Sequence, residues 1–421
     1  MNASLRTFAA LLLLPCAASA QSLWTVDAGG GGDFVELQAA IDFAADGDTL
    51  SIAAGTYAPI RIDGKALRLH AAGGTVTVFN NLGGTDEQAI LVRNLAASQS
   101  VVFDGIAAQS FLAGASSTIR VSDCAGPVWI QRAFVDAYGT IALHVDGSDS
   151  VVVDQGLFQT NLTTPSPSGA PQPGPGALVE DGSHLYAYDS QFRGSHGPIA
   201  FGGAPPVAAA QDGGHGLVLV DSEADLSGGS AHGGGGSAFF DGACTATGDG
   251  GSGLVLSGAS RLRFTGSGFF GAIGGLGDTC GAPGLAGADI VADPAALLID
   301  TERAARTIAF STGLLSAGDT LDALVQGEAG DLYLVFASLG AQAALALPTG
   351  FADGQLDLHV LPAPLTLVLA GALEASQDSA SLVAPSLPPG VVVSQLALQG
   401  VVLGADGFLH GAAPLGLTLL P

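Results

Sequence analysis

The chain has 421 residues, of which 63 are glycine and only 12% are charged, and its formal net charge is -26. Such an acidic balance argues against nucleic acid and anionic membrane surfaces as partners, because binding to phosphate depends on lysine and arginine. The mean hydropathy is positive, at +0.46. This value argues against a charge-rich disordered chain and predicts a large buried core.

The first twenty residues have the features of a secretory signal peptide. Arg6 supplies a positive charge, residues 8–14 are apolar, and Ala18-Ser19-Ala20 matches the small-x-small pattern that signal peptidase cleaves. We therefore expect residues 1–20 to be removed and the protein to be secreted or held at the cell surface. The alternative of a lipid anchor on Cys16 is disfavoured, because Pro15 stands where such a cysteine is preceded by a small residue.

The residues after the signal predict a strand, a turn and one amphipathic helix. Residues 24–27 alternate as a strand does, residues 29–32 are all glycine, and Phe34, Leu37 and Ile41 recur with helical spacing. A helix at this place would cover the open end of a repeat fold, which otherwise exposes apolar core and unpaired strand edges. Beyond it, no stretch reaches the roughly 18 uninterrupted apolar residues of a membrane span.

Short apolar strands recur between residues 50 and 270, separated by Gly, Asp, Ser and Asn. Five segments align, with internal spans of 15, 15, 14, 14 and 15 residues: Ile119 to Phe134, Leu143 to Phe158, Leu178 to Phe192, Leu217 to Ala231 and Leu254 to Phe269. The pattern predicts an all-β fold, a right-handed parallel β-helix over residues 21–295, in which equivalent residues stack about 4.8 Å apart. A β-sandwich linked by hairpins would not keep such a register.

Two details follow from this repeat. Phe134, Phe158, Phe192 and Phe269 should form an interior ladder that is interrupted at Ala231. The variable lengths should all leave the solenoid at one corner, which puts the insertions 163–176, 202–216, 233–253 and 271–287 on one side.

The beginning of the mature chain resembles that of the pectin-lyase-like superfamily, which includes pectinesterases and bacterial right-handed β-helix proteins. The motifs that carry the resemblance are Val26-Asp27, Gly32-Asp33-Phe34, Leu37-Gln38 with Ala40-Ile41, Gly47 to Ile52, and Gly55-Thr56-Tyr57. The resemblance implies the β-helix with its capping helix. It does not imply one function, since the superfamily includes lyases, hydrolases, esterases, adhesins and binding proteins.

From residue 296 the glycine-rich corners disappear and alternating apolar stretches are punctuated by proline. We expect residues 296–421 to form a separate β-sandwich. It is similar to the small C-terminal modules that follow repeats in secreted bacterial proteins, which implies attachment or end-capping.

Two short motifs bear on catalysis. Residues 88–93 are similar to the first glutamine motif of pectinesterases, but the Gln-Asp-Thr-Leu, second aspartate and Arg-Pro-Trp motifs are missing. One carboxylate cannot act as both nucleophile and acid. Ser195-His196-Gly197 is similar to a polygalacturonase motif, but the chain has no Asp-Asp pair for the acid and base of such hydrolases.

Three groups of residues are candidates for binding or cross-linking. His196, His215 and His232 lie in inserted corners and could converge on a ligand or metal, although loop histidines are more often solvated. Cys244 and Cys280 are the candidate disulfide of an exported protein, with Cys124 left as a buried apolar residue.

Asp123, Asp146, Asp181 and Asp221 lie three or four residues after the start of their repeats, so stacking should bring them to one edge as a weak Ca²⁺ site. The competing interpretation is that each aspartate hydrogen-bonds its own turn. The sequence requires no cofactor, and Ca²⁺ is the candidate that these aspartates suggest.

The sequence favours a secreted or cell-surface β-helix protein that binds polysaccharide, cell-surface glycan or another surface without catalysis. The alternative is a carbohydrate-active enzyme of the same superfamily, either a Ca²⁺-assisted polysaccharide lyase or a glycoside hydrolase.

Overall fold

The computed structural model describes residues 21–80, 88–111, 117–138, 140–161, 173–197, 199–201, 211–240, 247–275, 283–300, 306–339, 345–347, 358–360, 366–384, 394–404, 409–411 and 415–420. The expected signal peptide, Cys244 and Cys280 lie outside these ranges.

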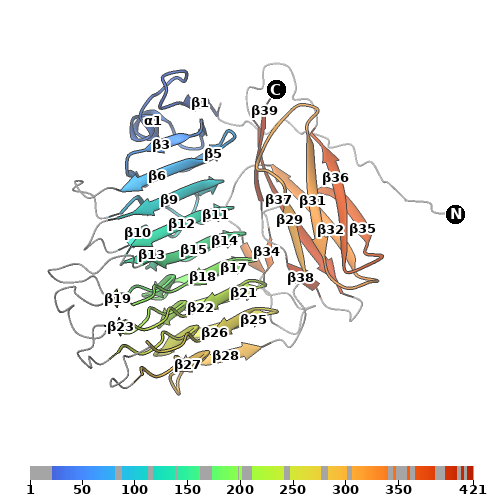
Figure 1. Ribbon diagram of the computed structural model, residues 1–421. Helices are drawn as coiled ribbons and strands as arrows, with labels where there is room; N and C mark the ends of the chain where they lie inside the picture. Colours follow the sequence, from blue (N-terminus) through green and yellow to red (C-terminus); the bar gives the residue numbers. More distant parts are fainter. Residues whose placement is uncertain are drawn as a thin grey trace.

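Residues 23–300 form the right-handed parallel β-helix that the repeat predicted, with three long sheets that we name A, B and C (Figure 1). The expected boundary at residue 295 is too early, because residues 297–300 still pair with residues 261–264 of the solenoid. Sheet A contains β1 (Leu23–Val26), β2 (Thr49–Ile52), β5 (Leu67–Ala71), β8 (Val101–Asp104), β11 (Val128–Gln131), β14 (Val151–Asp154), β17 (His184–Tyr188), β21 (Glu223–Ser227), β25 (Arg261–Thr265) and β28 (Leu297–Asp300). Sheet B contains β3 (Gly55–Tyr57), β6 (Val76–Asn80), β9 (Ile106–Ser110), β12 (Phe134–Tyr138), β15 (Leu157–Asn161), β18 (Gln191–Arg193), β22 (Ser230–His232) and β26 (Gly268–Phe270). Sheet C contains β4 (Ile60–Asp63), β7 (Ile90–Arg93), β10 (Ser117–Ser122), β13 (Ile141–Asp146), β16 (Ala177–Glu180), β20 (Leu217–Val220), β24 (Leu254–Ser257) and β27 (Ile290–Ala292).

Each coil runs from sheet C through sheet A to sheet B. Alternate residues point inward, so that Val151 and Val153 of β14 join the solenoid core while Val152 joins a separate cluster on the outer face. Residues with positive φ turn the chain from sheet A to sheet B in the successive coils from β8 onward, one in most coils and two in one of them. These residues are Gly105, Arg132, Gln155, Asp189, Gly228 with Gly229, and Gly266. Arg132 and Gln155 lack the conformational freedom of glycine, so another feature of the fold must hold them there.

The expected interior ladder is wrong at one rung. Phe134 pairs with Leu157 and is 40% exposed, whereas Val135 pairs with Phe158. The ladder therefore runs Val135, Phe158, Phe192, Ala231, Phe269. The cause is the corner between sheets C and A, which spans residues 123–127 in this coil but only 147–150 in the next.

The third repeat was also placed one residue late. Ala177, and not Leu178, pairs with Leu143 and Leu217. The length of the coil therefore varies at two corners: between sheets B and C, where the insertions lie, and between sheets C and A. The four insertions do share one corner, because each follows a strand of sheet B and precedes a strand of sheet C. The insertion 233–253 contains β23 (Ala238–Phe240), which pairs in parallel with β19 (Ile199–Phe201), the strand immediately before the insertion 202–216.

Helix α1 (Leu37–Phe43) packs at the N-terminal end, where Leu37, Ala40 and Ile41 are buried in the solenoid core. Among the described residues, no helix is long and apolar enough to span a membrane.

The C-terminal part has its own apolar cluster, separate from the solenoid core, and forms the expected sandwich. One sheet contains β29 (Thr307–Phe310), β31 (Thr320–Gln326) and β36 (Gln377–Val383). The other contains β30 (Leu314–Ser316), β39 (Leu415–Leu420), β37 (Ser394–Leu403), β32 (Leu332–Leu339) and β35 (Thr366–Ala372), with β38 (Leu409–Gly411) paired to β37 and a separate pair formed by β33 (Leu345–Leu347) and β34 (Leu358–Val360). This sandwich lies beside sheet A (Figure 1).

Candidate functional site

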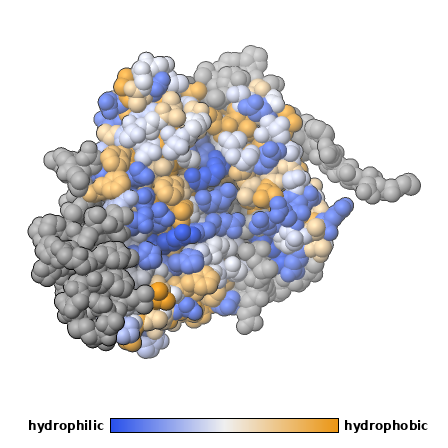
Figure 2. All heavy atoms as spheres, viewed as in Figure 1, coloured by the Kyte–Doolittle hydropathy of each residue, from blue (hydrophilic) through white to orange (hydrophobic). Residues whose placement is uncertain are grey.

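The strands of sheet A end in a row of mostly polar residues on the outer face of the solenoid. Pairing places the members in one line: His70, Asp104, Gln131, Asp154, Tyr188, Ser227 and Thr265. All seven are buried, although they lie outside the solenoid core. The sandwich covers this face, and hydrophilic residues gather along the line between the two parts of the molecule (Figure 2).

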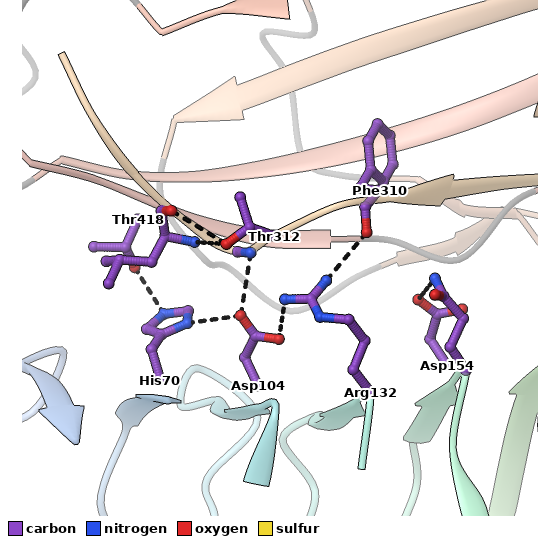
Figure 3. A network of polar contacts seen from close by, with 10 residues as sticks. His70, Asp104, Arg132, Asp154, Phe310, Thr312 and Thr418 are labelled. Atoms are coloured by element: carbon purple, nitrogen blue, oxygen red, sulfur yellow. Dashed lines mark hydrogen bonds and ion pairs between the residues drawn. The ribbon is translucent and has the colours of Figure 1, made fainter. Parts of the chain in front are cut away.

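Asp104 is the centre of the contacts between the solenoid and the sandwich (Figure 3). Its carboxylate is bonded by His70 Nδ1 at 3.0 Å, by the Arg132 guanidinium and by the backbone N–H of Gly313 at 3.1 Å. His70 Nε2 in turn lies 2.9 Å from Thr418 Oγ1, and Arg132 Nη1 donates to the carbonyl oxygen of Phe310 at 3.2 Å. We call these three contacts, from His70, Asp104 and Arg132 to the sandwich, the interdomain contacts.

Asp154 lies two strands from Asp104 in the same row. Burial raises the pKa of Asp154 to about 7, the negative charges of Asp189 and Asp104 add to this rise, and Arg132 opposes it. A carboxyl group with such a pKa can act as a general acid, and strand spacing puts Asp104 roughly 10 Å away. Asp104, however, already has three donors, and the sandwich covers the row. This arrangement fits a polar anchor better than an open acid–base pair.

A second polar group on sheet A surrounds Asp225. Its carboxylate bonds His184 Nε2 at 2.7 Å and Arg263 Nε at 2.5 Å, and Tyr186 contacts the other ring nitrogen of His184. Burial alone would raise the pKa of Asp225, but the hydrogen bonds from His184 and Arg263 hold it below its usual value. Asp225 is therefore an ionised, fully paired group.

Sheet B carries a second row on its outer face. The paired residues are Phe79, Gln109, Asp136, Gln159, Arg193, His232 and Phe270, which we call the sheet B row. Most of its side chains are accessible: Arg193 is exposed, Phe270 is 49% exposed, and the others apart from Asp136 are intermediate.

The contacts within the sheet B row fix its side chains. Asp136 Oδ1 accepts hydrogen bonds from Gln159 Nε2 at 3.2 Å and from Asn161 Nδ2 at 2.5 Å. The His232 ring stacks on Phe270 with a centroid distance of 4.7 Å. At the other end, Phe111 packs between Phe79 and Tyr138 at centroid distances of 5.4 and 3.9 Å. Aromatic rings at both ends therefore flank amide, carboxylate and guanidinium groups.

Sheet C brings two acidic groups together at its edge. Asp146 pairs with Arg120 at 2.5 Å, and His144 pairs with Glu180 at 2.7 Å. A hydrogen bond with Asp146 raises the pKa of the exposed Asp181. The carboxyl groups of Asp146 and Asp181 therefore compete for a proton, as paired carboxyl groups do in many acid–base sites.

The four aspartates proposed for Ca²⁺ do not share one column. Asp123, Asp181 and Asp221 occupy the same turn position with φ of 53°, 57° and 46°, but Gly147 takes this position in the coil between Asp123 and Asp181. Asp146 lies one residue earlier, opposite Ser122 and Glu180 in the pairing. In the part of the chain that the structure describes, no three His, Cys, Asp or Glu residues are grouped to hold a metal.

The three candidate histidines have different neighbours. His196 Nδ1 accepts from Gly235 N at 2.9 Å, and His215 Nδ1 accepts from Ser252 N at 3.0 Å. His232 belongs to the sheet B row, and its Nε2 lies 2.8 Å from Ser230 Oγ. Burial lowers the pKa of both His215 and His232, which favours their neutral forms at pH 7. Cys124 is a buried free cysteine, as expected, and burial raises the pKa of its thiol.

The insertions contain a structure that the sequence did not reveal, which we call the glycine array. Outgoing segments 194–197, 233–237 and 271–275 bond to returning segments 173–176, 211–216, 248–253 and 284–289. The cross-links are Ser195 N to Gly174 O, Gly214 N to Ser195 O, Gly234 N to Gly214 O, Gly251 N to Gly234 O, Ala272 N to Gly251 O and Gly287 N to Ala272 O, at 2.7 to 3.1 Å. Within one returning segment, Gly248 and Gly251 bond outgoing segments while Gly250 and Gly253 bond the next returning segment. This three-residue period matches polyproline II geometry.

Comparisons with known proteins do not identify a family. No family model matches the chain, and no curated protein matches it. Among solved structures, a rice weevil pectin methyl esterase has 11% identity and a TM-score of 0.27, covering 64% of this chain and 82% of its own. Tailspike protein 2 of Escherichia coli O157:H7 bacteriophage CAB120 has 12% identity and a TM-score of 0.25, covering 91% of this chain, which spans 65% of the tailspike. Function must therefore be argued from the faces of the solenoid.

Proposed function

We propose that the protein is exported and binds a polysaccharide along the sheet B row without catalysis. The observation that carries the proposal is the composition of this row, in which aromatic rings lie in line with amide, carboxylate and guanidinium groups. Aromatic rings offer flat apolar faces, while planar polar groups bond hydroxyls in fixed directions. Seven strands at the usual spacing make the row roughly 29 Å long, which suits a chain-like ligand.

The sheet B row itself argues for binding rather than chemistry. Asp136 is its only carboxylate, and Gln159 and Asn161 already donate hydrogen bonds to it. Glycoside hydrolysis requires two carboxyl groups placed across the scissile bond.

Titration of the mature protein with a panel of acidic and neutral polysaccharides tests this proposal. Phe270→Ala and Gln159→Ala should each weaken binding of the recognised polysaccharide about tenfold, since each removes a stacking or hydrogen-bonding partner. The control Arg93→Ala breaks the exposed ion pair with Asp63 on sheet C and should leave binding unchanged. Binding that survives both sheet B substitutions, or no binding across the panel, would reject the proposal.

One observation favours the enzyme as a second candidate. Asp146 and Asp181 share a hydrogen bond beside Arg120 on sheet C, so one can hold a proton while the other is ionised. A hydrolase or lyase at this place should release reducing ends or unsaturated uronates from a polysaccharide. Asp181→Asn should then abolish turnover, while Gln159→Ala should not affect the chemical step.

Export rests on the pattern of residues 1–20. Mass spectrometry of protein from the culture medium and the cell surface should find a mature N-terminus at Gln21. Intact Met1 on protein that stays inside the cell would contradict export.

A further inference from the structure

The two ends of the solenoid differ. Helix α1 closes the N-terminal end, where its apolar side chains enter the solenoid core. At the other end, β26, β27 and β28 are the last members of sheets B, C and A, and in the described part of the chain each pairs with a strand on one side only. Figure 1 shows the sandwich beside sheet A and no labelled element beyond β27 and β28. Among the described residues, no element therefore caps the last coil.

Apolar side chains are exposed at this open end. Leu298 and Ala292 occupy inward positions, because they pair with Leu262 and Leu256 of the solenoid core. Leu298 is nevertheless 38% exposed, and Ala292 is exposed as well. Large apolar patches on a surface usually mark interaction sites. Six of the twelve exposed large apolar residues of the described chain lie here: Phe270, Ile273, Leu285, Val291, Leu297 and Leu298.

Two of the carboxylates near this end are directed back along the solenoid. Asp289 Oδ1 accepts a hydrogen bond from Gly271 N at 2.8 Å, and Asp293 Oδ2 accepts one from Gly258 N at 2.8 Å. Both glycines belong to the preceding coil. Asp300, at the end of β28, is the only acidic residue within the three edge strands. The open face is therefore mainly apolar, although the chain as a whole is strongly acidic.

We propose that two copies of the chain meet at these open ends and form a two-fold symmetric dimer, with the solenoids joined end to end. The end of a second copy supplies the same three strand edges that this end lacks. A two-fold axis across the solenoid reverses the strand direction, so the facing edges pair antiparallel. Strand β28 faces its own copy, and the three-residue strands β26 and β27 face each other. The two cores then become continuous and bury Leu298 and Ala292.

The closed N-terminal end limits this assembly to two copies. In a head-to-tail stack, the open end of one solenoid would meet α1 of the next, which lies against β1 and β4 and presents no strand edge. When two open ends meet, only closed ends remain outside, so the assembly is a dimer and not a filament. The dimer is independent of what the sheet B row binds.

The size of the end face predicts a reversible dimer. Three short strands with their corners make a face roughly 25 Å across, and two such faces bury on the order of 1,000 Å² in total. This area is near the lower limit for a specific interface. The monomer and the dimer should therefore exchange at ordinary protein concentrations.

Sedimentation velocity of the mature chain between about 1 and 100 µM can test the proposal. The protein should pass from monomer to dimer over this range, with no larger species. Ala292→Lys should raise the dissociation constant about tenfold or more, because it places a charge in the joined cores at a position that is exposed in the monomer. Lysine also lowers the net negative charge, so weaker association cannot come from greater repulsion. The control Val383→Lys, at a residue of the sandwich that is 65% exposed, should leave association unchanged.

A charge pair tests which strands face each other. Leu298→Lys and Leu298→Glu should each be monomeric, whereas their mixture should form a heterodimer, because β28 faces β28 across the axis. The proposal is overturned if the parent chain stays monomeric up to about 100 µM or grows into larger assemblies. It is also overturned if Ala292→Lys associates as strongly as Val383→Lys does, or if the Leu298 mixture stays monomeric while both variants keep the thermal midpoint of the parent.

Discussion

Asp154 is the residue whose protonation should most affect the stability of the covered face. Its pKa rises to about 7 in the folded protein, mainly through burial, whereas an aspartate in the unfolded chain titrates near 3.8. The unfolded chain therefore releases this proton first as the pH rises. The stabilising effect of the protonated group is complete below about pH 4, and is lost between about pH 4 and pH 7.

Asp154→Asn should remove that loss, because an amide resembles the protonated carboxyl group at every pH. We expect the variant and the parent to have similar free energies of unfolding at pH 4. At pH 8 the variant should be more stable, by up to about 4 kcal/mol. Urea titrations at the two pH values measure the difference.

The control Asp63→Asn changes an exposed ion pair and should shift stability by less than about 1 kcal/mol at either pH. A variant that is equally destabilised at both pH values would show that Asp154 is ionised in the folded state.

The residues of the interdomain contacts could not have been chosen from the sequence. His70 and Asp104 are 34 positions apart, and His70 contacts Thr418 across 348 positions. Only pairing along sheet A places His70 beside Asp104, and only the docking of the sandwich gives both of them partners. For Asp104, the available signal was a polar residue that closes an apolar strand immediately before a turn, as in Val101–Asp104. That pattern alone is ordinary turn chemistry.

At the scale of strands and corners, the repeat predicted the β-helix because apolar spacing and strand stacking share one period. The predicted strand register was wrong where one corner is a residue longer than in the next coil. Phe134 is therefore exposed, and Val135 takes the interior position. A one-residue shift reverses which face a side chain occupies, so small differences in corner length matter more than the large insertions. The insertions leave the strand register intact because they lie outside it.

The glycine array gives the element scale its own prediction. A Cβ at Gly234 would lie 1.9 Å from the carbonyl oxygen of Ser195, which belongs to a neighbouring segment. That oxygen and Gly234 both take part in the cross-links of the array. Gly234→Ala should therefore destabilise the protein by roughly 2 to 4 kcal/mol, because backbone must move to make room. Chemical denaturation measures the loss.

Gly235→Ala is the matched control, one residue along the same segment. Its Cβ would meet only the His196 ring at 3.2 Å and the Ile273 oxygen at 3.6 Å. The cost should be below about 1 kcal/mol, because these neighbours need little adjustment and alanine also restricts the unfolded chain. Equal effects of the two substitutions would show that the segments are not packed as described. The sequence could not show this packing, since glycine-rich stretches are equally typical of loops and the bonded segments are far apart in the chain.

At the scale of the whole molecule, the net charge of -26 should make stability depend on salt. Repulsion among acidic groups opposes the compact state, and the Debye length falls from about 30 Å at 0.01 M to about 8 Å at 0.15 M salt. Raising NaCl over that range should increase the thermal midpoint by a few degrees. A midpoint that is independent of salt would mean that the carboxylates are already compensated by close partners.

The same titration decides whether the turn aspartates bind Ca²⁺. Asp181 and Asp221 are adjacent in their column, but Gly147 separates them from Asp123, and Asp221 already accepts a hydrogen bond from Ala259 N at 2.9 Å. Ca²⁺ needs six or more oxygen ligands, so two turn carboxylates, one of them engaged, make a poor site.

We therefore expect millimolar CaCl₂ to raise the thermal midpoint no more than NaCl of equal ionic strength does. The double substitution of Asp181→Asn and Asp221→Asn should lower the response to both salts alike, because it reduces only the net charge. A rise specific to Ca²⁺ that disappears in this double variant, and in chelator, would instead show that the column binds the ion, since a ligand of the folded state alone must raise the midpoint.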